Sequence, residues 1–246
     1  MTTSHVDTYL ARIAPRLDAV RERIALAAAR AHRSPQDITL VAVSKGHPPE
    51  AVVAAYHLGV RDFGENRVEE ADPKIHRVRE LLREAGQTDF PRWHLIGHIQ
   101  SRKAARAIGP YALIHSVDRL KIARRLNRFA RDMGRVQPIL LEVNISGEES
   151  KFGFSPEEVV EAVAEIATLE FLRIQGLMTM APLVEDPEEV RPVFAGLRTL
   201  RDELASIYPE LQWHHLSMGM TQDFEVAIEE GATIVRIGTA IFGPRE

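Results

Sequence analysis

Lys45 has the clearest chemical potential in this sequence, because it lies just beyond an apolar, largely β-branched run over 38–43. A run of this kind, without polar alternation, is typical of a strand buried on both faces. A lysine at the carboxyl end of such a strand is desolvated, which lowers its pKa and makes the amine a nucleophile toward an aldehyde. Most lysines are simply solvated, so position alone favours an ordinary surface side chain.

Two short loops near the end of the sequence favour an anion. Ser217, Gly219 and Thr221 lie in a small-residue loop that opens a predicted helix. Free backbone N–H groups, the helix dipole and a hydroxyl of Ser217 or Thr221 suit a phosphate there. Gly238 and Thr239 form a second such loop. Ordinary turns and helix caps explain both loops equally well. Beside a reactive lysine, however, a phosphate site is what a phosphorylated aldehyde such as pyridoxal 5′-phosphate (PLP) needs.

Arg236 is the third candidate, because its charge falls inside an otherwise apolar strand. Ile234, Arg236 and Gly238 share one face of that strand. A buried cation needs a partner. The pyridine nitrogen of PLP is one such partner, and a carboxylate such as Glu65 or Glu142 is the structural alternative.

The elements that position these residues alternate regularly along the chain. Alternating strands and helices imply parallel strands joined by right-handed crossovers, and eight such strands close a (β/α)8 barrel. All the candidates then fall at the carboxyl ends of strands, where barrel sites form. An open doubly wound sheet is the alternative. The predicted strands cover 38–43, 59–63, 92–96, 112–116, 137–144, 171–177, 211–216 and 232–237.

The two ends of the sequence complete the expected architecture. An amphipathic helical pattern covers 4–31, whereas no helix fits the residues 239–246 that follow the last predicted strand. We therefore expect the N-terminal helix to occupy the eighth position in the outer ring. Residues 1–246 are predicted to form a single domain, because no linker interrupts the pattern.

Composition narrows the class of protein. The chain has 246 residues, of which 45% are hydrophobic and 27% charged, with a net charge of −4. These values are typical of a soluble globular protein and give no reason to expect nucleic acid or membrane as a partner. The absence of cysteine excludes disulfides and thiolate catalysis and fits a cytoplasmic location. No signal peptide is visible, and the histidines lack the spacing of a metal site.

Motifs along nearly the whole chain resemble those of the pyridoxal phosphate homeostasis proteins, the YggS/PROSC family. They lie at 40–45, 63–67, 93–101, 143–148, 176–180, 216–220 and 235–243. The resemblance implies a barrel like the N-terminal domain of alanine racemase, with PLP as the cofactor. It also implies roles for eight residues: Lys45 forms a Schiff base with PLP, Arg236 faces the pyridine nitrogen, Ser217, Gly219, Gly238 and Thr239 hold the phosphate, and Asn66 and Asn144 lie near the ring.

Three functions compete at this point. The resemblance favours a monomeric PLP-binding protein of vitamin B6 homeostasis that turns over no substrate, with PLP-dependent apoenzymes or B6 salvage enzymes as partners. A PLP-dependent amino-acid racemase is the alternative, but racemisation in the related fold needs a second base from an added domain, for which no sequence remains after the last predicted strand. The third is a barrel that binds another phosphate ester.

Overall fold

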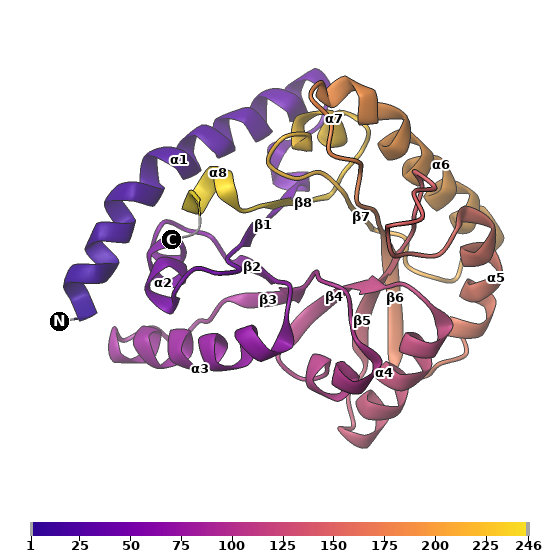
Figure 1. The fold of residues 1–246 in the computed structure, drawn as a ribbon, viewed down its shortest axis with the longest axis horizontal. Coiled ribbons are helices and arrows are strands. Elements are labelled where there is room, and N and C mark those ends of the chain that lie inside the picture. Colours follow the sequence, from indigo (N-terminus) through magenta and orange to yellow (C-terminus); the bar gives the residue numbers. More distant parts are fainter. Residues whose placement is uncertain (1, 245–246) are drawn as a thin grey trace.

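The computed structural model describes residues 2–244. Its centre is a closed barrel of eight parallel strands in chain order, in which β8 pairs with β1, and helices surround it (Figure 1). The predicted (β/α)8 barrel is therefore confirmed, and the open sheet is excluded. The strands are β1 (Thr39–Val43), β2 (Asp62–Glu65), β3 (Arg92–Leu95), β4 (Tyr111–Val117), β5 (Gln137–Glu142), β6 (Leu172–Met178), β7 (His215–Ser217) and β8 (Ile234–Ile237).

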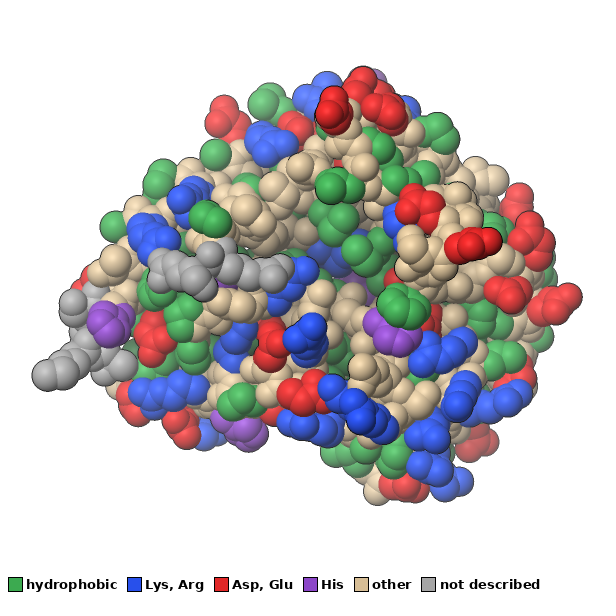
Figure 2. Space-filling view, in the orientation of Figure 1, with side chains coloured by type: hydrophobic (Ala, Val, Ile, Leu, Met, Phe, Trp, Pro, Cys, Tyr) green, Lys and Arg blue, Asp and Glu red, His purple; other side chains and the backbone are tan. Residues whose placement is uncertain are grey.

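Helices connect successive strands on the outside of the barrel. Their ends follow local sequence signals: at the start of α5, for example, Ser155 accepts a hydrogen bond from the backbone N–H of Glu158, whose side chain accepts one from Ser155 in return. The connecting helices are α2 (Pro49–His57), α3 (Val68–Glu84), α4 (Leu120–Asp132), α5 (Pro156–Ile166), α6 (Arg191–Ile207) and α7 (Phe224–Glu229), with 3₁₀ turns η1 (Pro35–Asp37), η2 (Ser101–Ala107) and η3 (Pro187–Val190). Figure 2 shows Lys and Arg side chains gathered over and around α4, whose opposite face is buried.

The N-terminal helix α1 (Thr2–Arg30) completes the outer ring. It packs against α2, α7 and α8 (Thr239–Phe242), and Figure 1 shows it running along the outside of α8. The expectation that α1 fills the eighth position is confirmed. The expectation that no helix follows the last strand was wrong, because one helical turn forms at 239–242. Within residues 2–244, no helix has both the length and the apolar character needed to cross a membrane.

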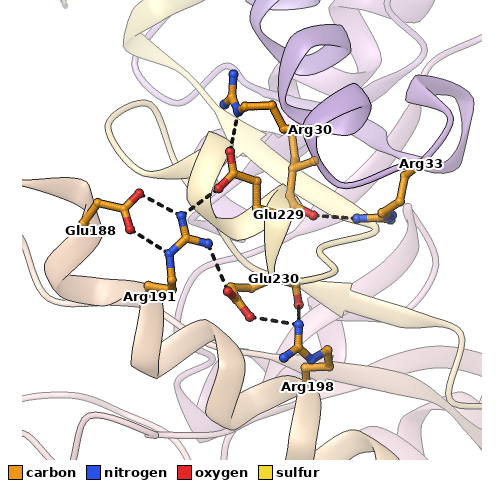
Figure 3. Close-up of polar contacts among 8 residues, drawn as sticks. Arg30, Arg33, Glu188, Arg191, Arg198, Glu229 and Glu230 are labelled. Carbon is orange, nitrogen blue, oxygen red and sulfur yellow. Dashed lines mark hydrogen bonds and ion pairs between the residues drawn. The ribbon is translucent and has the colours of Figure 1, made fainter.

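A cluster of ion pairs joins α1 to α6 and α7 (Figure 3). Arg191 contacts three carboxylates, of Glu188, Glu229 and Glu230, at 2.7, 2.7 and 3.0 Å. From α1, Arg30 reaches the carboxylate of Glu229 at 2.6 Å. Because the cluster links the first helix to two of the last, it helps to close the ring.

The inside of the barrel carries polar side chains as well as apolar ones. His115 on β4 contacts Ser217 on β7, and these strands are not neighbours in the sheet, so the two side chains meet within the barrel. Beside them lies a small apolar cluster that is separate from the main core. Its members are Val41, Leu113, Leu140, Met178 and Ile234.

Every strand differs from its predicted bounds by at least one residue, and the largest differences are at β2 and β7. The prediction for 59–63 was shifted, because Gly59, with φ +89°, ends α2 through backbone hydrogen bonds and the chain joins the sheet only at Asp62. Gly64 and Glu65 are therefore strand residues. The strand predicted over 211–216 is shorter in the structure and begins only at His215. The segment before it is held outside the sheet by Trp213, whose Nε1 donates to the carbonyl of Tyr208.

Candidate functional site

A cavity of about 370 Å³ opens at the carboxyl ends of the strands. Figure 2 shows a hollow in the middle of the visible face, with hydrophobic and basic side chains around and within it. Segments that end or follow β1, β2, β6, β7 and β8 supply most of the lining. The lining comprises Val43, Lys45, Asn66, Ile96, the segment 180–183, the segment 220–223, Arg236, Gly238 and Thr239.

Lys45 is set in place by the backbone of the residue before it. Ser44 is fully buried, and its hydroxyl donates to Glu65 at 2.7 Å while its carbonyl accepts from Lys74 at 2.8 Å. Lys74 also pairs with the carboxylate of Glu65 at 2.6 Å. A turn follows, in which the N–H of His47 donates to the carbonyl of Ser44. This buried ion pair therefore anchors the strand end that carries Lys45.

Arg236 brings a buried cation to the floor of the cavity. Its side chain is only 4% exposed and donates to the hydroxyl of Ser217 at 2.6 Å and to the carbonyl of Thr179 at 2.9 Å. Burial lowers the pKa of Arg236 to about 10, so the group stays charged near neutral pH. Among the described residues no carboxylate pairs directly with it, neither Glu65 nor Glu142.

The turn after β8 comes close to β1. A Cβ atom added to Gly238 would lie 3.1 Å from the carbonyl oxygen of Val43, which leaves room for little more than the glycine. Gly238 and Thr239 line the cavity, and Thr221 lines it from the turn after β7. In that turn the N–H of Met220 is already used, because it donates to the carboxylate of Asp223 at 2.6 Å.

Three predicted residues do not line the cavity. Ser217 is fully buried, and its hydroxyl accepts from Arg236 beneath the cavity. Thr221 and Thr239 are the residues with a hydroxyl group that line the cavity. Gly219 lies in the turn with φ +93°, and its carbonyl accepts from the N–H of Arg236. Asn144 is used within its own loop, where its amide donates to the carbonyl of Glu148 at 2.9 Å. Direct contact of these three residues with a cofactor stays a prediction.

Asn66 offers a polar atom that has no partner. It follows β2 and lines the cavity beside Lys45, and its Oδ1 is buried without a hydrogen bond to any other described residue. A buried acceptor of this kind costs free energy unless a donor reaches it. Asn66 also lines a second cavity of about 250 Å³ alongside. Asn66 therefore carries an unsatisfied acceptor at the border between the two cavities.

One wall of the cavity was not predicted from the sequence. Residues 181–183 follow β6 and supply apolar lining, and the side chain of Leu183 is 85% exposed at the rim. The signal was weak, since the segment is a proline-containing loop without periodicity.

The residues present fit PLP. The cavity combines a lysine amine, a deep cation, apolar walls and the small residues of two turns, together with an unpartnered acceptor. This set matches a phosphorylated aromatic aldehyde better than an apolar ligand, because the polar groups lie apart around an apolar centre.

Comparisons with known proteins agree with this geometry. The family described as "Alanine racemase, N-terminal domain" matches residues 16–246. The chain is 45% identical over 231 residues to the pyridoxal phosphate homeostasis protein of Aquifex aeolicus, which covers 94% of this chain and 97% of that one. It is 42% identical over 243 residues to the protein of the same name in Escherichia coli, covering 95% and 97%.

Solved structures extend the comparison. PipY of Synechococcus elongatus, solved with PLP bound, matches with a TM-score of 0.77 at 38% identity and covers 91% of this chain and 100% of its own. An alanine racemase of Clostridium difficile matches with a TM-score of 0.65 at 16% identity, which shows a shared fold alone. On the strength of the family match and of relatives at 42–45% identity, the chain belongs to the pyridoxal phosphate homeostasis protein family.

Proposed function

We propose that this chain binds PLP in the cavity at the carboxyl ends of its strands and serves PLP homeostasis without turning over a substrate. One observation carries the proposal: Lys45, Arg236 and the turn at 238–239 line the same cavity. The names of the relatives and the PLP-bound structure of PipY support it.

Each residue has a role in this proposal. When bound, PLP supplies an aldehyde that reacts reversibly with an amine. Lys45 is that amine, and Arg236 faces the pyridine nitrogen as a hydrogen-bond donor. Gly238 and Thr239 hold the phosphate, while Asn66 donates or accepts at the ring. Ser217 acts from beneath by holding Arg236.

The lining also supports binding without turnover. Among the residues that line the cavity, only Lys45, Asp223 and Arg236 ionise. Asp223 accepts a hydrogen bond from the N–H of Met220, and burial raises its pKa. Arg236 is held as a cation. A proton-transfer reaction on both faces of a bound amino acid would need a second free base, and these groups do not supply one.

Borohydride reduction tests the binding site. Reduction of the protein loaded with PLP should add the mass of PLP less one oxygen atom to the peptide that contains Lys45, because condensation releases water and reduction adds two hydrogens. Mass spectrometry measures this change. Lys45→Ala should abolish the adduct and the visible absorbance. Lys151→Ala is the matched control, because Lys151 donates to the carbonyl of Met180 near the rim and should be dispensable. An unmodified Lys45 peptide in loaded wild type would refute the proposal.

Hydrogen exchange tests the absence of turnover. Amino acids incubated with loaded protein in heavy water should gain no deuterium at Cα faster than they do with free PLP. Fast exchange would instead support the racemase alternative.

We further propose that the protein is a cytoplasmic monomer whose partners are PLP-dependent apoenzymes or B6 salvage enzymes. Light scattering should give the mass of one chain. Reduced, PLP-fixed protein should fail to activate an apoenzyme that the unreduced protein activates.

A further inference from the structure

A line of buried polar side chains crosses the inside of the barrel, from Arg236 under the cavity to Asp62 at the amino end of β2. Arg236 contacts Ser217 Oγ at 2.6 Å, and Ser217 Oγ contacts His115 Nδ1 at 2.8 Å. His115 Nε2 lies 2.9 Å from His94 Nδ1, and His94 Nε2 lies 2.9 Å from Asp62 Oδ1. All five residues are buried. We call this series the interior chain.

The two ends of the interior chain fix the direction of every hydrogen bond in it. Arginine can only donate and a carboxylate can only accept. If both rings are neutral, His94 donates from Nε2 to Asp62 and accepts at Nδ1 from His115 Nε2–H. The Nδ1 atom of His115 then accepts from the hydroxyl of Ser217, whose oxygen accepts from Arg236. No donor or acceptor along the chain is left over.

An additional proton would break this order. With His94 protonated, it would donate to His115 Nε2, and His115 would have to donate from Nδ1 to Ser217. Arg236 and His115 would then both donate to the same hydroxyl oxygen, and the hydroxyl hydrogen would lose its acceptor. A buried polar network that is only partly satisfied is costly.

The pKa directions of Asp62 and His115 agree with this order. Burial alone would raise the pKa of Asp62, but hydrogen bonds from Arg92 and His94 outweigh it and lower that pKa to about 2. Burial, with His94 and Arg236 nearby, holds the pKa of His115 well below its usual range. These directions favour a carboxylate at Asp62 and a neutral ring at His115.

The interior chain also connects two faces of the molecule. Asp62 lines a cavity of about 310 Å³ formed by the strand starts, including Thr39 and Leu40. Arg236 lines the cavity at the opposite, carboxyl end. Barrel interiors are usually filled with branched apolar residues. A line of polar side chains from one face to the other is therefore unusual for a barrel, and it indicates a role that apolar side chains could not fill.

We propose that Asp62, His94, His115 and Ser217 are positioning residues that hold the Arg236 guanidinium in one orientation under the cavity, through a hydrogen-bonded chain of fixed polarity with both histidines neutral and protonated at Nε2. This inference deepens the proposed function and rests on it only for the claim that Arg236 faces a ligand. Among the described residues no carboxylate forms an ion pair with the buried guanidinium, and Glu142 and Asp223 act on it only from a distance. Its orientation therefore depends on its hydrogen bonds to the hydroxyl of Ser217, which the interior chain holds, and to the carbonyl of Thr179.

The polarity is tested on protein without PLP, so the outcome does not depend on the proposed function. ¹⁵N chemical shifts distinguish the two neutral tautomers of histidine from the imidazolium. His94 and His115 should both be neutral with hydrogen on Nε2. Asp62→Asn can still present an oxygen to His94 and should keep both tautomers. Asp62→Leu removes that acceptor and should shift the signals of His115 as well as those of His94. A wild-type ring that is charged, or protonated at Nδ1, would overturn the inference.

The link to the cavity is tested by PLP titration followed by absorbance. Ser217→Ala leaves Arg236 Nη1 without its acceptor and should weaken PLP binding roughly tenfold. Asp62→Leu, at the far end of the chain, should weaken binding in the same direction and shift the absorbance of bound PLP. Asp72→Leu is the matched control, because Asp72 pairs with Arg106 outside the interior chain and its loss should leave binding unchanged.

The outcomes separate the two claims. If Asp62→Leu folds and binds PLP like the Asp72→Leu control, the positioning role is wrong even if the tautomers are as assigned. If wild-type protein does not bind PLP at all, the proposed function fails while the tautomers still decide the polarity. Should Asp62→Leu fail to fold, PLP binding by Ser217→Ala still tests the positioning of Arg236, and the tautomers in wild-type protein still test the polarity of the chain.

Discussion

Lys74 and Glu65 form a buried ion pair next to the strand end that carries Lys45. Neither residue lines the cavity, so the contribution of the pair to stability can be measured without changing the cavity. Lys74→Met should leave the Glu65 carboxylate buried without its cation and lower the free energy of unfolding by about 3 kcal/mol. Urea denaturation measures the change. Lys103→Met removes a more exposed pair with Glu69 and should cost below about 1 kcal/mol. Equal losses in the two variants would contradict the special weight given to the buried pair.

Glu142 makes stability depend on pH. Burial, with help from Asp118, raises its pKa from 4.5 to about 7, while Arg236 acts in the opposite direction. The folded protein therefore holds this proton more tightly than the unfolded chain. The resulting stabilisation is complete below about pH 4.5 and is lost as the pH rises to about 7.

Glu142→Gln should remove this dependence. Relative to wild type, the variant should gain up to roughly 3 kcal/mol of unfolding free energy between about pH 4 and pH 8. Urea denaturation across that range measures the difference between the two proteins, which cancels the other titrating groups. Parallel stability curves would show that Glu142 is ionised in the fold at neutral pH.

At the scale of the elements, the turn between β7 and α7 depends on Gly219. Its φ is +93°, and an added Cβ would lie 2.6 Å from the Cβ of Ala227 and 2.8 Å from the Cα of Phe224. Gly219→Ala should therefore cost roughly 2 kcal/mol or more, since strain and overlap add. Gly86→Ala has a similar φ of +77° with no atom within 4 Å, so it should show the strain alone. Thermal unfolding distinguishes the two variants, and equal shifts would mean that packing around Gly219 is irrelevant.

Element types were more predictable from the sequence than side-chain positions. The alternation of apolar runs and helical patterns predicts eight strands and a barrel, because both signals are local. The predicted start of β2 was wrong because backbone hydrogen bonds end α2 at Gly59, and the hydrophobic pattern of the sequence does not show where these bonds form. The contact between the hydroxyl of Ser217 and Arg236 was also not predicted. Strand alternation gives the face of a residue but not its depth within a closed barrel.

The interior chain was also beyond prediction from sequence. His94 and His115 belong to neighbouring strands, but Ser217 joins them across the barrel, 102 positions later in the sequence. Only closure of the sheet brings these groups together. Lys45 and Arg236 were easier to find, since a charge at the end of or within an apolar strand stands out in the sequence itself.

At the scale of the whole molecule, the ion-pair cluster around Arg191 ties the first helix to the last third of the chain. Arg191→Met leaves Glu229 and Glu230 with less compensation and should cost roughly 1–2 kcal/mol of unfolding free energy. The loss should shrink at high salt, which screens partly exposed charges. Arg124→Met breaks an isolated, exposed pair with Glu165 and should change little. Urea denaturation at low and high salt provides the comparison, and a salt-independent loss would point to packing instead.

The position of α1 has a consequence for how the protein is made. Its apolar stripe, which includes Leu17 and Val20, is covered partly by α2 but also by α7 and α8. During synthesis, α1 emerges from the ribosome long before α7 and α8. Part of the apolar face of α1 therefore stays uncovered while the residues between α2 and α7 are synthesised, and closure of the ring is expected to be late.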